Sequence, residues 1–418
     1  MFSTKDLFAK ALGIEAPWFI DRMGFDPVGG KLDIWIDFKP GSLFRYVDPE
    51  KGIDGMFKAY DTTEKTWRHL NFFQHVCLLH ARIPRVDIGD GKYRQVSPPW
   101  DGLAHGFTLL FEAFLLELAK VMPVNRIAKL CGLTNQKLWP MLRKYTELAR
   151  QEADYSGVTQ VGIDETAARK GHDYVTLFVD VQEHRTLYVT PGRDSETITS
   201  FCTDFQEHGG KPEQIEQVSC DMSPAFIKGV GNHLPEADIV FDRFHVTKVV
   251  NDAVDAIRKE EVRSNPVLKG AKYLFLKNWQ NLTRKQRRRF QALRLSDMNL
   301  KTFRAYHIRE AFQLVYEAKT PRMFERLLKQ WYYWATHSRL PQMVKAAKTI
   351  RRHWQGVLSW ASQRISNGIL EGFNSIFQAA KSKARGYKKF ETIRTIIYLL
   401  TGKLDFSKIN PYRPTHTN

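Results

Sequence analysis

The chain has 418 residues, which suits roughly two to four domains, and its 63 Lys and Arg against 45 Asp and Glu give a formal net charge of +18. Such an excess of cations favours a polyanion, nucleic acid first, as the partner, because each Lys or Arg placed on a phosphate releases condensed counterions. Four scattered cysteines without a CxxC pair exclude a disulfide framework and a thiolate zinc site, and no apolar run reaches the roughly 20 residues of a membrane span, so we expect a soluble, cytoplasmic protein.

Residues 1–98 have the pattern of a small β-rich module. Residues 2–13 suit a short amphipathic helix, and residues 32–38 alternate as a strand does, with Ile34, Ile36 and Phe38 facing away from Asp33, Trp35 and Asp37. Residues 57–60 and 69–83 add further strand-like segments. The module is expected to end where Ser97-Pro98-Pro99-Trp100 interrupts the chain.

Residues 99–153 are predicted to be helical. A strongly apolar helix over 107–121 is followed by the pattern helix, turn at Gly132, helix, with Asn125 and Thr134 as candidate N-caps. The second of these two helices carries amide and cationic side chains, which suit base edges and phosphates. They are Asn135, Gln136, Lys137, Arg143 and Lys144. The pattern alone fits both an ordinary helical hairpin and a helix-turn-helix DNA-binding domain.

Three short β-branched segments each end in a carboxylate. They are Val161-Gly162-Ile163-Asp164, Val218-Ser219-Cys220-Asp221 and Ile239-Val240-Phe241-Asp242. A carboxylate at the carboxyl end of a buried strand faces the crevice where open α/β sheets bind ligands, so we expect the three acids at one edge of a sheet.

Between the first two acids the pattern predicts a hairpin and a helix. Residues 173–181 and 185–190 alternate as strands around a turn at 182–184, and residues 195–207 suit a helix with Asp194 as candidate N-cap. The predicted order is three antiparallel strands, then helix, strand, helix, strand, helix. This is the order of a ribonuclease-H-like α/β core, which we assign to residues 154–259.

Residues 260–355 are predicted to form an α-helical insertion, because 150 residues separate Asp221 from Glu371 whereas 57 separate Asp164 from Asp221. The insertion contains a basic run with Arg284, Lys285, Arg287, Arg288 and Arg289. These cations either track a DNA backbone or form a solvated face. Four adjacent aromatics at 331–334 cover a whole helix turn, which favours packing or an interface over base stacking.

A last helix over 367–380 carries Asn367, Glu371 and Asn374 on one face, at spacings of four and three. We expect residues 356–406 to complete the core and to bring Glu371 to the other acids. A basic loop follows the helix and contains Lys381, Lys383 and Arg385. Residues 390–400 suit a closing helix, and residues 407–418 a loosely ordered tail.

Taken together, the motifs of the chain are specific although each alone is weak. They are Gly162-Ile163-Asp164-Glu165, Cys220-Asp221-Met222-Ser223, Asp242-Arg243-Phe244-His245 and Asn367-Gly368-Ile369-Leu370-Glu371-Gly372-Phe373-Asn374, followed by Ala384-Arg385-Gly386-Tyr387. In this order they resemble bacterial insertion-sequence transposases of the ISL-three family, which are DDE enzymes. The resemblance covers about residues 30 to 400.

The resemblance implies a catalytic triad of Asp164, Asp221 and Glu371. These carboxylates would hold two divalent ions, Mg²⁺ or Mn²⁺, with Asp164 bridging both, because such ions require hard oxygen ligands. Supporting roles are expected for Glu165, Asp180, Asp242, His245, Asn367 and Asn374. Asp242 and His245 match a (C/D)xxH signature that the resemblance shares with hAT and Mutator transposases, but Asp242 also suits the N-cap of the next helix.

The family's N-terminal zinc module, with CPxCG knuckles, is expected to be degenerate here. The corresponding stretches, 48–52 and 86–91, lack thiolates, so we predict a module without zinc in which Asp48 and Lys51 form an ion pair. His69, His75 and His80 with Cys77 offer substitute ligands. Because His80 faces the opposite side of a strand from His75 and Cys77, structural histidines are favoured.

The resemblance finally implies a DNA transposase that binds the terminal inverted repeats of its own element, cleaves there and joins the ends to target DNA. Its partner would be double-stranded DNA in the bacterial nucleoid, and a homodimer or larger assembly is expected because two ends must meet. One alternative is a structure-specific nuclease of the same fold. Another is a domesticated DNA-binding repressor without catalysis, although the presence of all three acids favours the transposase.

Overall fold

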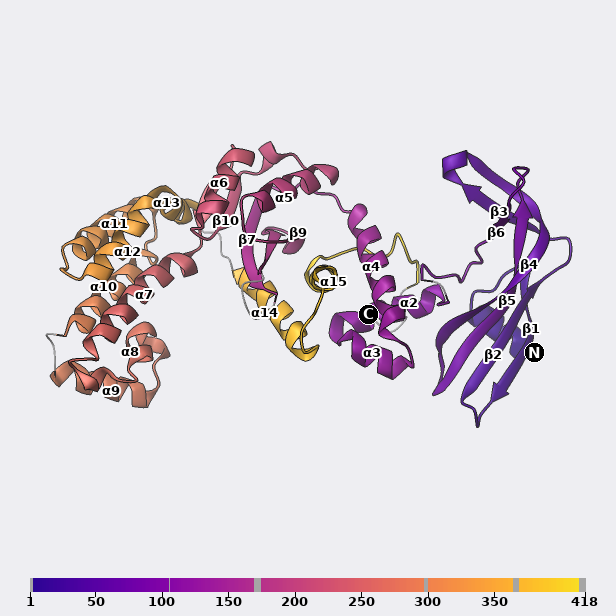
Figure 1. The fold of residues 1–418 in the computed structure, drawn as a ribbon, viewed down its shortest axis with the longest axis horizontal. Coiled ribbons are helices and arrows are strands. Elements are labelled where there is room, and N and C mark those ends of the chain that lie inside the picture. The colour runs from indigo at the N-terminus through magenta and orange to yellow at the C-terminus, as the bar shows by residue number, and fades with distance from the viewer. Residues whose placement is uncertain (1–2, 105, 169–173, 297–299, 364–367, 413–418) are drawn as a thin grey trace. The chain divides into compact units, whose positions relative to one another are not determined.

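The structure, a computed structural model, describes residues 3–104, 106–168, 174–296, 300–363 and 368–412. The chain forms two compact units of mixed α/β structure (Figure 1). The first comprises Met1–Ala153 and Ala379–Asn418, and the second comprises Asp154–Gln378. Within the described ranges, no helix is long and apolar enough to cross a membrane.

The first unit starts with α1 (Thr4–Ala11) and a six-stranded sheet formed by residues within 18–95. The strands are β1 (Trp18–Asp26), β2 (Lys31–Phe38), β3 (Leu43–Asp48), β4 (Ile53–Phe72), β5 (His75–Asp87) and β6 (Tyr93–Gln95). Their order is β1-β2-β5-β4-β3, with β6 beside β5. Only the β2–β5 pair is parallel among these described strands.

The alternation predicted for residues 32–38 is confirmed, since Leu32, Ile34, Ile36 and Phe38 are buried on the core side of β2. The strand-like residues 69–83 are divided between two strands, β4 and β5. Phe73 adopts a left-handed conformation (φ 52°) and the chain turns back there, so that β4 pairs with β5.

Polar contacts occupy the positions discussed above for zinc. His80 lies between Asp33 (2.7 Å) and Thr66 (2.9 Å), and His69 contacts Thr108 (2.8 Å). Burial lowers the pKa of His69 to about 4. The predicted ion pair of Lys51 with Asp48 is present at 3.9 Å, and Asp90 joins it at 3.2 Å.

Three helices follow the sheet: α2 (Leu109–Val121), α3 (Val124–Cys131) and α4 (Asn135–Gln151). Gly132 ends α3 in a left-handed conformation (φ 65°), as its predicted place in a turn requires. The predicted cap Asn125 is wrong, because the helix already begins after Pro123. Thr134 does hold the N-cap position of α4, but its side chain makes no capping hydrogen bond.

A buried carboxylate joins α2 to α4. Glu112 is fully buried and accepts hydrogen bonds from the backbone N–H groups of Leu103 (2.8 Å) and Ala104 (2.7 Å) and from the Tyr145 hydroxyl (2.7 Å). Asn410 in turn donates to Tyr145 Oη (2.9 Å) and to the Leu109 carbonyl (2.8 Å). This chain of hydrogen bonds therefore connects residues 103 and 104 with α2, α4 and Asn410.

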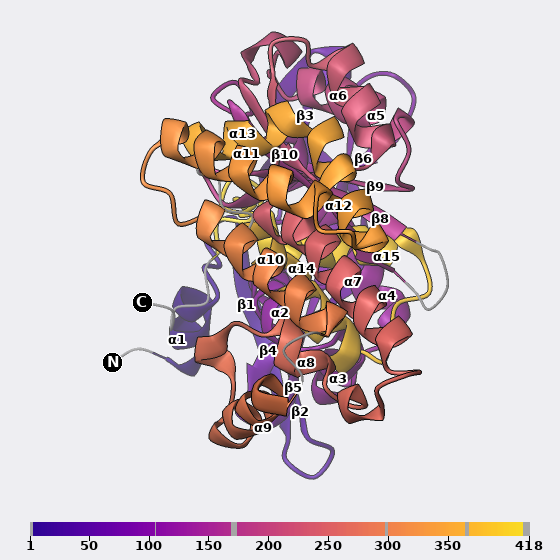
Figure 2. The ribbon, with the colours of Figure 1, turned by 90° about the vertical axis from the view of Figure 1, so that its left-hand side faces the viewer.

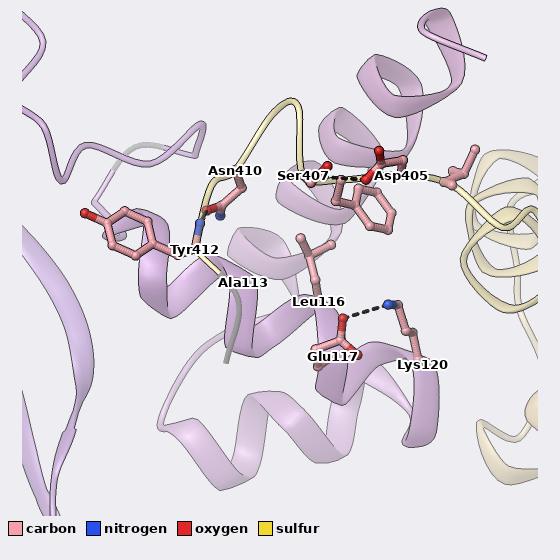
Figure 3. Close-up of a pocket in the computed structure, with 10 residues that line it drawn as sticks. Ala113, Leu116, Glu117, Lys120, Asp405, Ser407, Asn410 and Tyr412 are labelled. Carbon is pink, nitrogen blue, oxygen red and sulfur yellow. Dashed lines mark hydrogen bonds and ion pairs between the residues drawn. The ribbon is translucent and has the colours of Figure 1, made fainter. Parts of the chain in front are cut away.

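The C-terminal residues belong to this first unit. α15 (Phe390–Thr401) packs on α4 and α2 of this unit. The sequence predicts instead that residues 390–400 close the ribonuclease-H-like core. Beyond it, the chain runs along α2, and a cavity of about 240 Å³ lies between them (Figure 3). Because Asn410 is buried and bonded, the prediction of a loose tail from Ser407 is wrong for residues 407–412.

The second unit contains a five-stranded sheet, counted over the described residues, in the order β11-β10-β7-β8-β9. Its elements are β7 (Gln160–Ala167), β8 (Tyr174–Asp180), β9 (Arg185–Pro191), α5 (Glu196–Glu207), β10 (Gln217–Cys220), α6 (Pro224–His233), β11 (Asp238–Phe241) and α7 (Arg243–Glu261). β7, β8 and β9 are antiparallel, whereas β10 and β11 run parallel to β7. The predicted order of strands and helices is confirmed.

Three details differ from the prediction. β7 does not end at Asp164 but continues to Ala167, because β8 still pairs with it there. Asp180, a predicted supporting acid, is the last residue of β8 and pairs with Val161 near the start of β7. Its Oδ1 accepts hydrogen bonds from Gln182 N (3.1 Å) and Glu183 N (3.0 Å) in the turn to β9, and its Oδ2 accepts one from Arg185 (3.2 Å). The N-cap of α5 is Ser195 and not the predicted Asp194, although Asp194 Oδ1 accepts a hydrogen bond from Thr197 N (3.2 Å) in the first turn.

Helices make up the rest of the second unit. They are α8 (Lys272–Leu276), α9 (Arg284–Ser296), α10 (Lys301–Val315), α11 (Pro321–Thr336), α12 (Pro341–Arg352), α13 (Trp354–Gln363) and α14 (Gly368–Lys383), of which the residues from Ala379 on belong to the first unit. α7 packs against α10 and α12, and α11 lies beside both (Figure 2). Of the four adjacent aromatics, Trp331 is buried as predicted and donates to the Ile308 carbonyl (2.9 Å), whereas Tyr333 and Trp334 are exposed.

Candidate active site

The register of the parallel strands places three acids in one row. Gly162 pairs with Ser219, so Asp164 and Asp221, each two residues further along, are level with each other. Cys220 pairs with Phe241, so Asp242 follows at the same level. Because β10 ends at Cys220, β7 has only β8 beside it beyond this point, and the acids lie at an open edge.

Asp164 lies at the β7 end of this row, next to Asp221, and accepts hydrogen bonds on both of its carboxylate oxygens. Its Oδ1 accepts a hydrogen bond from the Glu165 N–H (2.8 Å), and its Oδ2 accepts one from Asn374 Nδ2 (2.6 Å). Burial raises the pKa of Asp164, and the nearby Asp242 and Asp221 carboxylates raise it further. A cation bound at this edge would therefore stabilise the ionised form of Asp164 and lower its pKa again.

Asp242 and His245 form the start of α7. Asp242 is the N-cap, and its Oδ1 accepts a hydrogen bond from Phe244 N (3.1 Å). Its Oδ2 lies 3.4 Å from His245 Nδ1, an ion-pair distance at which the ring nitrogen is not aimed as in a hydrogen bond. The interaction with Asp242 raises the pKa of His245, and the Asp164 and Asp221 carboxylates raise it too.

Asp221 and Glu165 complete the acidic group. Asp221 Oδ1 accepts a hydrogen bond from Ser223 N (2.9 Å), which fixes the turn before α6. Burial raises the pKa of Glu165, as does the Asp221 carboxylate, while the Arg193 guanidinium lowers it. Asp164, Glu165, Asp221, Asp242 and His245 thus lie within electrostatic reach of one another.

α14 runs along β7. Leu370 packs so closely on Gly162 that a Cβ at position 162 would lie 2.9 Å from Leu370 Cδ1. One turn later Asn374 bonds to Asp164, and Gln378 Nε2 donates to Thr166 Oγ1 (2.9 Å). Asn374 Oδ1 is buried and has no hydrogen-bond partner among the described residues. Asn374 therefore positions Asp164 through its amide nitrogen, and its amide oxygen remains available beside Asp164.

Glu371 precedes Asn374 by three residues on α14 and is exposed. Across the part of the chain that the structure describes, no three His, Cys, Asp or Glu side chains are grouped closely enough to hold a metal ion. The assignment of Glu371 to the catalytic group therefore stays a prediction. Asn367 lies outside the described residues.

The predicted DNA-binding side chains differ in their exposure and in whether they already donate a hydrogen bond within the protein. Asn135, Gln136 and Lys137 are exposed at the start of α4, whereas Arg143 is partly buried and Lys144 donates to the Leu103 carbonyl (2.9 Å).

On α9, Arg284, Lys285 and Arg288 are exposed, but Arg287 donates to the Gln280 carbonyl (3.0 Å) and Arg289 to the Lys269 carbonyl (2.7 Å). In the segment between α14 and α15, Arg385 is exposed, as is Lys383 at the end of α14, while Lys381 is partly buried.

Sequence reasoning gave no role to three residues that shape the site. Gly162 permits the approach of α14, Arg193 acts on Glu165, and Phe244 stands exposed between Asp242 and His245. The glycine and the phenylalanine both lie inside quoted motifs. Their positions inside these motifs are the sequence feature that could have identified them.

Comparison with known proteins supports one family. A family model described as transposase matches residues 161–397. The chain is 25% identical over 345 residues to the transposase for insertion sequence element IS1001 of Bordetella parapertussis, and the alignment covers 80% of this chain and 84% of that protein. It is 24% identical over 425 residues to the transposase for insertion sequence element IS1557 of Mycobacterium tuberculosis, with 94% of each chain covered. The row of acids and α14 lie inside the matched residues.

Proposed function

The chain belongs to the ISL-three family of insertion-sequence transposases, and we propose that it binds the terminal inverted repeats of its own element, cleaves DNA there and joins the ends to target DNA. The observation that carries the proposal is the row of Asp164, Asp221 and Asp242 at the open edge of the sheet. The strand order β11-β10-β7-β8-β9, with its antiparallel and parallel halves, supports a ribonuclease-H-like core.

The donor groups at this edge suit divalent cations by their chemistry, although among the described residues their present spacing does not form a metal site. Carboxylate and amide oxygens are the hard ligands that Mg²⁺ and Mn²⁺ prefer, and the raised pKa of Asp164 together with the unpaired Asn374 Oδ1 suits a cation at this place. In the proposal, Asp164, Asp221 and Glu371 hold two such ions. When bound, they supply activation of the attacking oxygen and neutralisation of the leaving oxygen.

The remaining side chains orient these groups. Asn374 fixes one oxygen of Asp164, and the packing of Leu370 on Gly162 keeps α14 close to β7, which favours delivery of Glu371 from the same helix. His245, whose pKa Asp242 raises, can carry a positive charge beside the acids and so attract a phosphate oxygen.

We further propose which surfaces contact DNA. The start of α4 would act as the recognition helix of a helix-turn-helix, and the exposed cations of α9 and of the 381–385 segment would contact phosphates. The N-terminal sheet would be the counterpart of the family's zinc module without its metal. Because two transposon ends must be joined, the active form would be a homodimer or larger assembly working on DNA in the bacterial cytoplasm.

The test incubates the purified protein with Mg²⁺ and a plasmid carrying the DNA that flanks its gene, and maps the cut and joined strands. Asp221→Asn should lower cleavage about 100-fold or more, because charge stabilisation by a bound ion contributes several kcal/mol. Asp252→Asn is the matched control, since Asp252 is an exposed residue of α7.

Cleavage at the repeat termini followed by strand joining, retained in Asp252→Asn, would support the transposase. Cutting of branched DNA without joining would instead indicate the nuclease. Tight binding without any cutting, equal in all three proteins, would leave only the repressor.

A further inference from the structure

The side chain of Phe244 is exposed beside the row of acids. Phe244 lies in the first turn of α7, between Asp242 and His245, and its side chain is 57% exposed. Single exposed apolar residues are common on protein surfaces and by themselves indicate nothing. Phe244 is unusual in its neighbours, because Asp242, two positions before it, and His245, directly after it, both belong to the candidate active site.

The ring is held in place although it is not buried. The Phe244 N–H donates to Asp242 Oδ1 (3.1 Å), so the backbone is fixed by the cap of α7. The ring meets His245 edge to face, with centroids 5.5 Å apart and planes at 77°. An aromatic ring with a fixed backbone and an open surface is prepared to stack on a flat partner.

Cations border the same edge. Arg243 is exposed next to Phe244, and its guanidinium lies over the Tyr316 ring (5.0 Å) and donates to Gln313 (3.4 Å), so its position is also fixed. Arg193 is held in a similar way, with its guanidinium over the Tyr174 ring (5.0 Å). Fixed cations suit phosphates and an open ring suits a base, which is the combination that binds an unpaired nucleic-acid strand.

We propose that Phe244 is a base-stacking platform that receives the nucleobase next to the phosphate to be cut. The inference rests on the proposed function and adds the ligand of one subsite, a single unstacked base of the cleaved strand. Because every base has a π-face, the subsite should accept any of the four. Phe244 is thus a positioning residue, and stacking on it holds the strand with the phosphate over the acids.

The experiment uses the full-length protein and duplexes of the element's end in which one nucleotide at a time around the cut site is abasic. At one position the abasic nucleotide should reduce kcat/KM of the wild type by about 5- to 150-fold, the range expected for one base stacked on an aromatic ring. Phe244→Ala should show that loss on intact DNA and no further loss with the abasic duplex.

Two further variants separate stacking from mere apolar contact. Phe244→Leu keeps an apolar side chain without a ring and should behave like Phe244→Ala, whereas Phe244→Trp should retain wild-type activity. Tyr273→Ala removes a comparably exposed ring (60%) from α8 and is the matched control, with activity unchanged. Melting temperatures of all variants should agree with that of the wild type, because the ring is exposed.

A binding measurement keeps this inference distinct from the proposed function. In Asp221→Asn, 2-aminopurine placed at the sensitive position should be quenched on binding, and the double variant Asp221→Asn, Phe244→Ala should restore its fluorescence. Full activity of Phe244→Leu, equal losses at every abasic position, or a change in oligomeric state without a change in quenching would overturn the platform. Absence of cleavage by the wild type would refute the proposed function, while quenching would still test the stacking.

Discussion

Asp242 serves a helix and a site at the same time. Its Oδ1 caps α7, and its Oδ2 faces His245 in the row of acids. The sequence left both roles open, because an Asp at a strand end suits either. The structure supports the cap directly, and a substitution can separate the two contributions.

Asp242→Asn should keep the cap, since Asn caps helices as well as Asp, and the melting temperature should stay unchanged. Asp242→Ala should lower the free energy of unfolding by about 1 kcal/mol. Loss of the carboxylate charge should lower the pKa of His245 in both variants, which an NMR titration of the imidazole measures. We expect cleavage to fall about 10-fold in Asp242→Asn. Unchanged cleavage and an unchanged pKa would reduce Asp242 to a cap.

At the scale of elements, the contact of α14 with β7 depends on one missing side chain. A Cβ on Gly162 would lie 2.9 Å from Leu370 Cδ1 and 3.3 Å from Val181 Cγ2, so Gly162→Ala must displace the Leu370 side chain or α14 with it. We expect a loss of about 1–3 kcal/mol of stability and a larger proportional loss of cleavage, because the same helix holds Asp164 through Asn374. Thermal melts and cleavage rates give the two quantities.

Gly372→Ala provides the matched control on α14 itself. A Cβ at position 372 has open space within 4 Å, and Ala favours a helix over Gly by about 0.5–1 kcal/mol, so this variant should melt at the same or a higher temperature. Equal behaviour of the two variants would mean that the close approach at Gly162 has no functional consequence.

The hydrogen-bonded connection between α2 and α4 depends on the carboxylate of Glu112. Glu112→Ala would leave two backbone N–H groups and the Tyr145 hydroxyl buried without their acceptor, so we expect a loss of at least about 3 kcal/mol in denaturant unfolding. Glu117→Ala, which removes a surface carboxylate paired with Lys120 on the same helix, should change stability by less than about 0.5 kcal/mol.

The effect of Glu112 should also depend on pH. Burial raises the pKa of Glu112 above its ordinary value of 4.5, so the folded state binds the proton more tightly than the unfolded state. The stability that Glu112 contributes is therefore fully present below the unfolded pKa and decreases as pH rises through the folded pKa. The difference in free energy of unfolding between wild type and Glu112→Ala should be larger at low pH. A difference that is constant over pH would contradict a raised pKa of Glu112 in the folded state.

The sequence predicted elements better than it predicted their ends and partners. The succession of strands and helices in the second unit was predicted from β-branched runs followed by acids and from the hairpin and helix patterns between them. Where β7 ends could not be read locally, because its last residues are held by β8 alone. Likewise the spacing of Asn374 on its helix predicted a shared face, but its bond to Asp164, 210 residues away, depends on the packing of Leu370 on Gly162.

At the scale of the whole molecule, a net charge of +18 predicts that DNA affinity depends steeply on salt. Replacing Arg284, Lys285 and Arg288 together by Ala should reduce the slope of log K against log salt by about 0.9 for each cation that contacts a phosphate. Arg289→Ala should leave the slope unchanged and lower stability instead, because its guanidinium is used on the Lys269 carbonyl. Fluorescence anisotropy over a salt series measures both, and an unaltered slope in the triple variant would remove α9 from the DNA interface.

The first unit is assembled from both ends of the chain, and this has a consequence for protein synthesis. Asn410 bonds to Tyr145, which precedes it by 265 residues. Ribosomes add roughly 5–20 residues per second, so the two partners are made roughly 13 to 50 seconds apart. During that interval α4 is already translated while its C-terminal neighbours are still unmade. A nascent chain must therefore produce the entire second unit before Asn410 can donate its hydrogen bond to Tyr145.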